Sequence, residues 1–117
     1  MRILSWNARG LGSTRAFNSL LSHKQDWKPD LIFLMETHCQ HEKLERWKIK
    51  LGFNSKLVIN SVGLSGGLCL FWTNDNVVEL LTYSQDHIDV RIRLGNNKIW
   101  RFTGFYGHPV QAQRVHS

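Results

Sequence analysis

The chain has 117 residues, 42% of them hydrophobic and five of them tryptophans, so it is long enough for one core and too apolar for a disordered protein. Its formal net charge of +6 favours polyanionic partners such as nucleic acids but identifies none. Because the apolar runs are too short to span a bilayer and no secretory signal is visible, we expect no membrane contact and an intracellular location, in the nucleus or cytoplasm. Cys39 and Cys69 are then expected to be reduced, with a single disulfide as the alternative.

Strands and helices alternate in the first half of the chain. Apolar residues recur at helical spacing in two segments, and each of these segments follows a short apolar run that is typical of a buried strand. In chain order the sequence predicts a strand at 2–6, a helix that Ser13 or Thr14 caps and Pro29 stops, a strand at 30–35, and a helix from about 41 to 51 that Gly52 caps.

The second half contains only strand patterns. Turn signals rich in asparagine and glycine separate them, and one strand alternates strictly between apolar and charged residues. The expected strands are 56–60, 67–73, 77–84, 87–94 and 98–106. Residues 110–117 are expected to form a frayed end. The order β-α-β-α followed by an antiparallel meander indicates a mixed α/β fold.

Asn7 and Glu36 each follow the point where a predicted strand runs out. Since the first two strands should be parallel, their ends meet at one edge of the sheet, where α/β folds place ligands. Mg²⁺ takes one or two protein carboxylates together with waters and phosphate, which suits Glu36, and the amide of Asn7 can support a metal or phosphate. The alternatives are an ordinary polar residue ending a strand and a turn-forming asparagine.

Tyr106 ends the last predicted strand and carries a phenol that can hydrogen-bond a phosphoryl oxygen. The alternative is a tyrosine with its ring on the core and its hydroxyl in water. Ser65-Gly66-Gly67 could admit a close backbone approach, but a plain turn is the simpler interpretation.

Other motifs are incomplete. Gly10-Leu11-Gly12 lacks the third glycine of a dinucleotide loop, and Glu45 stands where a zinc-protease helix needs its second histidine. His38, Cys39 and His41 have no distant fourth partner that would complete a zinc site. Several arginines form either a phosphate-facing surface or a solvated basic face: Arg2, Arg9, Arg15, Arg91, Arg93 and Arg101.

Four segments together resemble the endonuclease/exonuclease/phosphatase superfamily, which includes exonuclease III-like enzymes. They are Ile3-Leu4-Ser5-Trp6-Asn7 with Arg9-Gly10-Leu11, Pro29 to Thr37, Ser65-Gly66-Gly67-Leu68, and Phe105-Tyr106-Gly107-His108-Pro109. The likeness is closest to the endonuclease domain of plant LINE-type (non-LTR) retrotransposons. It implies the N-terminal half of a four-layer α-β-β-α sandwich over residues 1–117.

The resemblance also implies roles for three residues. Glu36 would be a Mg²⁺ ligand, Asn7 would help to organise the metal and the phosphate, and Tyr106 would contact the scissile phosphate of DNA. The family's second half brings an Asp-x-Asn segment and a final Ser-Asp-His segment with the general base, and neither follows Tyr106 here. Ser84-Gln85-Asp86-His87 only looks like the latter, because it precedes Tyr106.

Three hypotheses follow for the chain. The first is a fragment of a metal-dependent DNA endonuclease of retrotransposon type that is inactive alone, since loss of a general base alone typically costs about 10²–10⁴ in rate. The second is a basic nucleic-acid-binding remnant without catalysis. The third is a non-functional gene remnant. Half of a two-sheet fold would also expose apolar sheet surface, and so we expect a tendency to self-associate.

Overall fold

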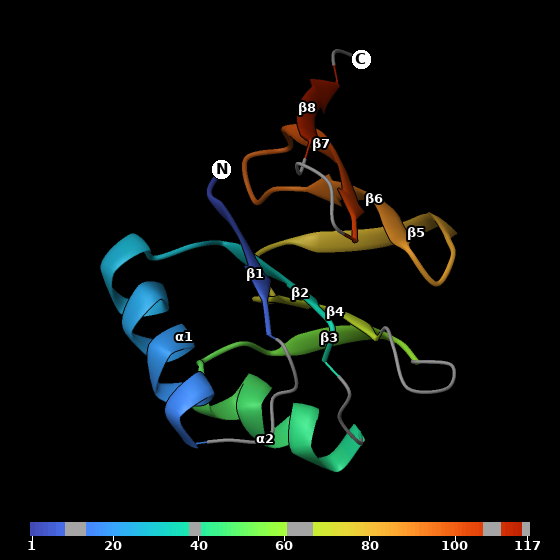
Figure 1. Ribbon diagram of the computed structural model, residues 1–117. Helices are drawn as coiled ribbons and strands as arrows, with labels where there is room; N and C mark the ends of the chain where they lie inside the picture. The colour runs from blue at the N-terminus through green and yellow to red at the C-terminus, as the bar shows by residue number, and fades with distance from the viewer. Residues whose placement is uncertain (9–13, 38–40, 61–66, 107–110, 116–117) are drawn as a thin grey trace.

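The computed structural model describes residues 1–8, 14–37, 41–60, 67–106 and 111–115. Helices and strands alternate at first, and strands follow one another from β3 onward (Figure 1). The elements are β1 (Ile3–Asn7), α1 (Thr14–Trp27), β2 (Leu31–Met35), α2 (His41–Lys50), β3 (Ser55–Ile59), β4 (Leu68–Trp72), β5 (Val77–Tyr83), β6 (His87–Arg93), β7 (Ile99–Phe105) and β8 (Gln111–Val115).

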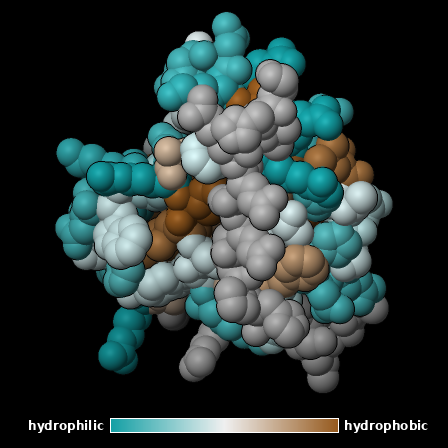
Figure 2. All heavy atoms as spheres, turned by 90° about the horizontal axis from the view of Figure 1, so that it is seen from above, coloured by the Kyte–Doolittle hydropathy of each residue, from teal (hydrophilic) through white to brown (hydrophobic). Residues whose placement is uncertain are grey.

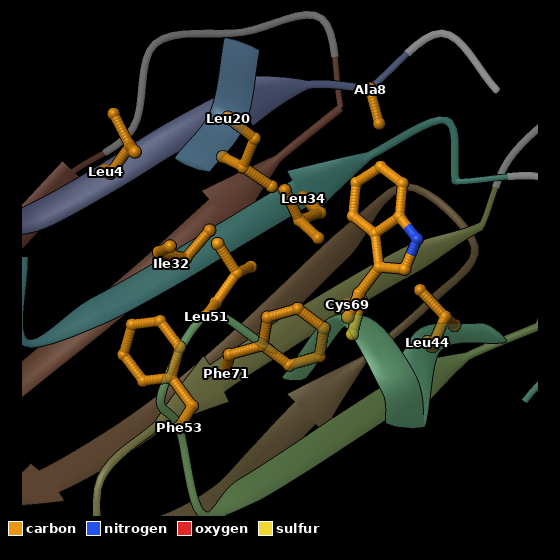
Figure 3. Close-up of a cluster of buried hydrophobic side chains, with 11 residues drawn as sticks. Leu4, Ala8, Leu20, Ile32, Leu34, Leu44, Leu51, Phe53, Cys69 and Phe71 are labelled. Atoms are coloured by element: carbon orange, nitrogen blue, oxygen red, sulfur yellow. The ribbon is translucent and has the colours of Figure 1, made fainter. Parts of the chain in front are cut away.

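The first sheet has the strand order β1-β2-β4-β3, and its first two strands are parallel as predicted. Both helices lie on one face of this sheet, where Leu20 of α1 and Leu44 of α2 pack against Ile32 and Leu34 of β2. Figure 3 shows this core between the helices and the sheet. Burial of these apolar side chains holds the helical layer in place.

The second sheet is an antiparallel meander with the order β5-β6-β7-β8. Its inner face packs on the free face of the first sheet, and Phe33 of β2 meets Phe102 of β7 edge to face at a centroid distance of 5.6 Å. Strand β2 is therefore buried on both sides, which explains its unbroken apolar run. The expected α/β sandwich is confirmed, with one helical layer and two packed sheets.

Strand β8 corrects the expectation of a frayed end at residues 110–117. Its backbone pairs with β7 in antiparallel register, from Thr103 opposite Gln111 to Ile99 opposite Val115. The sequence Gln-Ala-Gln-Arg-Val has no apolar alternation, so periodicity gave no signal. An outer strand can nevertheless form, because backbone groups supply the hydrogen bonds of a ladder.

Both helices end as the sequence predicts. After α2, the amide of Gly52 donates to the carbonyl of Ile49 (3.0 Å) and that of Phe53 to the carbonyl of Lys48 (3.0 Å). This pair of bonds is a Schellman cap, and the φ of +85° at Gly52 is the reason that glycine suits the position. Helix α1 ends at Trp27, two residues before Pro29.

Apolar side chains also reach the surface. Figure 2 shows hydrophobic atoms in a hollow on the face seen from above. Among the side chains that pack against the core between the sheets, Met1, Ile3 and Trp100 are only partly buried. Outer strand β5 further exposes Val77 and Tyr83.

Candidate functional site

Asn7 and Glu36 lie at neighbouring strand ends, as the sequence predicts. Asn7 pairs with Met35 across the parallel strands, so Glu36 is the next residue beyond that pair. The amide of Ala8 donates to the carbonyl of Met35 (2.8 Å) and carries the pairing past the end of β1. Ile3 packs on the core between the sheets, and alternation along β1 places Asn7 on the same face.

The backbone of Glu36 adopts a left-handed conformation, with φ at +53°. This conformation costs a residue with a Cβ roughly 1–2 kcal/mol. The next residue anchors it, because the amide of the buried Thr37 donates to the carbonyl of Gly67 (3.1 Å). Strained residues that the surrounding structure holds in place are frequent at functional sites. Gly67, which the sequence marked only as a turn glycine, thus helps to set the direction of Glu36.

Tyr106 reaches this strand edge from the second sheet. Its hydroxyl donates a hydrogen bond to Oε1 of Glu36. Glu36 and Tyr106 are both half-buried, whereas Asn7 is exposed. The fold therefore brings together the three residues that the sequence singled out, two by strand pairing and the third by packing of one sheet on the other.

Gly104 explains why the sheets approach so closely beside this site. A Cβ at Gly104 would lie 2.7 Å from Cε2 of Phe33, and real Cβ atoms essentially never come this near to another atom. Only a glycine at this position lets the backbone of β7 pack directly against the Phe33 ring. Tyr106 follows two residues later, so this contact places it over the end of β2. Sequence reasoning missed this role of Gly104, because the contact joins residues of two different sheets.

Residues 84–86 form the hairpin turn between β5 and β6, and His87 is the first residue of β6. Nδ1 of His87 lies 2.6 Å from Oγ of Ser84, and Nε2 lies 3.0 Å from Oγ1 of Thr82. Both ring nitrogens are thus engaged by hydroxyls. The spaced Ser-Asp-His sequence is explained by turn structure, and its side chains do not reproduce a carboxylate–histidine pair.

The arginines of the described residues lie on two sides of the molecule. Arg15 lies on α1, whereas Arg91, Arg93 and Arg101 lie on the second sheet, on the other side of the sandwich. Arg91 contacts Glu79 (3.4 Å), and Arg101 binds Asp89. This arrangement favours the solvated basic face over one phosphate-facing surface.

Several further sequence candidates lie outside the described residues. These are Arg9, His38, Cys39, Ser65, Gly66 and His108. His41, at the start of α2, contacts Oδ1 of Asn60 through Nε2 (2.9 Å).

A buried carboxylate on the second sheet also escaped sequence reasoning. Asp89, only 4% exposed, accepts hydrogen bonds from Nε (3.0 Å) and Nη2 (2.7 Å) of Arg101 and from Oγ1 of Thr103 (3.1 Å). The hydrogen bonds from Arg101 hold the pKa of this carboxyl below its usual range, against the effect of burial. Asp89 is one of the charged residues that alternate with apolar ones in the strand expected at 87–94, and such a pattern predicts a face in water, but cross-strand neighbours cover this carboxylate.

The donor atoms at the strand edge suit a hard cation. The carboxylate of Glu36 and the amide oxygen of Asn7 are ligands of the kind that Mg²⁺ takes, and this ion keeps several waters in phosphate sites. Within the described ranges, no cluster of three or more His, Cys, Asp or Glu side chains could hold a metal ion. A pocket of about 430 Å³ lined by Arg2 and Trp27 lies at the opposite end of β1 and is separate from this edge.

Comparison with known proteins adds one match. The model of the endonuclease/exonuclease/phosphatase family matches residues 4–116, which includes Asn7, Glu36 and Tyr106. No curated protein matches the chain. Neither α1 nor α2, nor any other helix in the described part, is long and apolar enough to cross a membrane.

Proposed function

Because the chain belongs to the endonuclease/exonuclease/phosphatase family, whose members are nuclease- and phosphatase-type hydrolases, we propose that Asn7, Glu36 and Tyr106 form the metal and phosphate site of a DNA endonuclease of the retrotransposon type. One observation carries the proposal: the hydroxyl of Tyr106 meets the carboxylate of Glu36 at the strand end that Asn7 also reaches. The site is thus assembled from three segments that are far apart in the sequence.

Each residue has a distinct role in this proposal. Glu36 is the anionic ligand of Mg²⁺, and its oxygens stand at the edge of the sheet where a phosphate can approach. Asn7 contributes its amide, which can accept from a metal-bound water or donate to a phosphate oxygen. When the substrate binds, the hydroxyl of Tyr106 turns its single proton from Glu36 to a phosphoryl oxygen of the substrate. The ion supplies charge neutralisation at the phosphate when it is bound.

Hydrolysis also needs a base that activates water. The Ser84–His87 segment offers the only lookalike that the sequence suggested, and its histidine ring is engaged by Ser84 and Thr82. We therefore propose that the chain binds metal and DNA at this edge and that, on its own, it nicks DNA negligibly.

A plasmid-nicking assay tests the proposed inactivity, and any nicking that it detects also tests the site. Supercoiled DNA is incubated with Mg²⁺ and with the wild-type protein or the Glu36→Gln variant. Glu42→Gln is the matched control, because Glu42 is an exposed glutamate at the start of α2. We expect no nicking above background. Clear nicking that Glu36→Gln abolishes would overturn the proposed inactivity and support the site. Nicking that both variants retain would overturn the site itself.

Nucleic-acid binding through positive charge, without a metal site and without catalysis, is the second candidate function, and the net charge of +6 favours it. Contacts to phosphates release counterions, so the affinity should fall steeply as salt rises. Fluorescence anisotropy with a labelled duplex at several salt concentrations measures this slope. An affinity that does not change with salt would contradict phosphate attraction.

A further inference from the structure

The turn between β5 and β6 holds the ring of His87 from two sides. Thr82 donates its hydroxyl proton to Oδ2 of Asp89 (3.3 Å). In one tautomer of the His87 ring, the Thr82 oxygen then accepts from Nε2–H, and Nδ1 accepts from the hydroxyl of Ser84. Hydrogen bonds thus connect Ser84, His87, Thr82 and Asp89 in one chain.

The backbone of the same turn is closed by further bonds. The amide of Ser84 donates to the carbonyl of His87 (3.0 Å), and the amide of Asp86 donates to Oγ of Ser84 (3.1 Å). Ser84 therefore bonds to both the ring and the carbonyl of His87. These bonds lie on both sides of the Asp86 carbonyl and orient it.

This turn reaches Tyr106 directly. The amide of Tyr106 donates to the carbonyl of Asp86 (2.7 Å). One residue earlier, Phe105 pairs with His87 in the ladder, and the two rings stack at a centroid distance of 5.7 Å. The backbone on which the Tyr106 phenol is mounted is thus held by the Ser84–His87 turn.

We propose that His87 is a positioning residue for Tyr106. By fixing the Ser84–His87 turn, it holds the amide of Tyr106 in place and so directs the phenol to Glu36. The Ser84–His87 segment, which resembles a Ser-Asp-His motif in sequence, thus contributes to the site by orienting Tyr106. The functional meaning of this role rests on the proposed metal and phosphate site, whereas the positioning itself is tested without metal or DNA.

Fluorine NMR observes the phenol directly. The chain has two tyrosines, so a Tyr83→Phe background labelled with meta-fluorotyrosine gives one resonance, from Tyr106. Glu36→Ala in this background defines the chemical shift of Tyr106 without its acceptor. We expect His87→Ala to move the resonance toward that position. Arg91→Ala serves as the control and should leave the resonance unchanged. Arg91 lies on the same strand as His87, is exposed, and forms an ion pair with Glu79.

A second pair of variants covers the case in which His87→Ala does not fold. Ser84→Ala removes the hydroxyl and retains the backbone, and it should move the Tyr106 resonance in the same direction. Ser84→Thr restores a hydroxyl and should return the resonance toward the wild-type position. The proposal is overturned if Glu36→Ala moves the resonance and neither His87→Ala nor Ser84→Ala does. If the variants give the expected NMR shifts but the wild-type protein binds no Mg²⁺, the proposed function is contradicted and the positioning role of His87 is not.

Discussion

The phenol of Tyr106 in the second sheet donates a hydrogen bond to Oε1 of Glu36 in the first sheet, although 70 positions separate the two residues in the chain. The contact lies at the edge where strands β1 and β2 end, and it joins the two layers there. Packing of Gly104 on Phe33 and the hydrogen bond from Tyr106 to Asp86 both set its geometry.

Tyr106→Phe tests the contribution of this bond to stability. Removing the hydroxyl deletes a hydrogen bond to a half-buried carboxylate, and we expect the free energy of unfolding to fall by about 0.5–1.5 kcal/mol. Urea denaturation measures the change. Tyr83→Phe is the control, because Tyr83 is 61% exposed, and it should have little effect. Equal losses in the two variants would contradict a specific role for the Tyr106 hydroxyl.

Gly104→Ala tests the close approach of the sheets. The added methyl group would overlap the Phe33 ring, and overpacking of this kind typically costs about 1–3 kcal/mol. The matched control is Gly95→Ala, whose added Cβ would be 3.6 Å from its nearest neighbour, an ordinary van der Waals contact. Thermal and urea unfolding of both variants give the comparison. If Gly104→Ala unfolds like the control, the sheets do not depend on this glycine.

Two substitutions at Glu36 separate backbone strain from side-chain chemistry. Both Glu36→Ala and Glu36→Gly lose the carboxylate, but only alanine has a Cβ at a φ of +53°. We expect the glycine variant to be more stable than the alanine variant by about 1 kcal/mol, contrary to the usual order of these residues. Equilibrium unfolding of the pair measures this difference, and a more stable alanine variant would show that the position is not strained.

The lowered pKa of Asp89 should make the free energy of unfolding depend on pH. Because hydrogen bonds from Arg101 lower its folded-state pKa, the unfolded carboxyl, with a pKa of about 3.9, takes up protons first as the pH falls. The stabilisation is therefore complete above about pH 4 and is lost as the pH falls through the lower folded-state value. Asp89→Asn should cost about 1–3 kcal/mol at neutral pH and progressively less in that acid range.

Urea unfolding at a series of pH values measures this dependence. Glu79→Gln is the control, since the pair of Glu79 with Arg91 is exposed and should contribute less than about 1 kcal/mol. A constant difference between Asp89→Asn and the wild type down to strongly acid pH would contradict a lowered pKa at Asp89.

Local patterns predicted most of the architecture. The unbroken apolar run of β2 predicts a strand buried on both faces, and the helix between β1 and β2 predicts that these strands pair in parallel. These signals depend on periodicity and on connection rules, which a single sequence displays. The same rules placed Asn7 beside Glu36, because parallel strands end at the same edge.

The remaining features depend on contacts between distant segments. Nothing local shows that Gly104 lies on Phe33 or that the Asp86 carbonyl receives the amide of Tyr106. Strand β8 is held by backbone pairing and carries no apolar alternation. The Ser84–His87 segment resembles a catalytic motif in sequence alone, because serine and aspartate are also common turn residues.

Magnesium titration by calorimetry tests the central claim, that Glu36 at this strand end holds a divalent metal ion. We expect saturable binding of one ion by the wild-type protein, weakened more than about tenfold by Glu36→Gln and retained by Glu42→Gln. An affinity that is equal in the wild type and Glu36→Gln, or no saturable binding to the wild type, would contradict it.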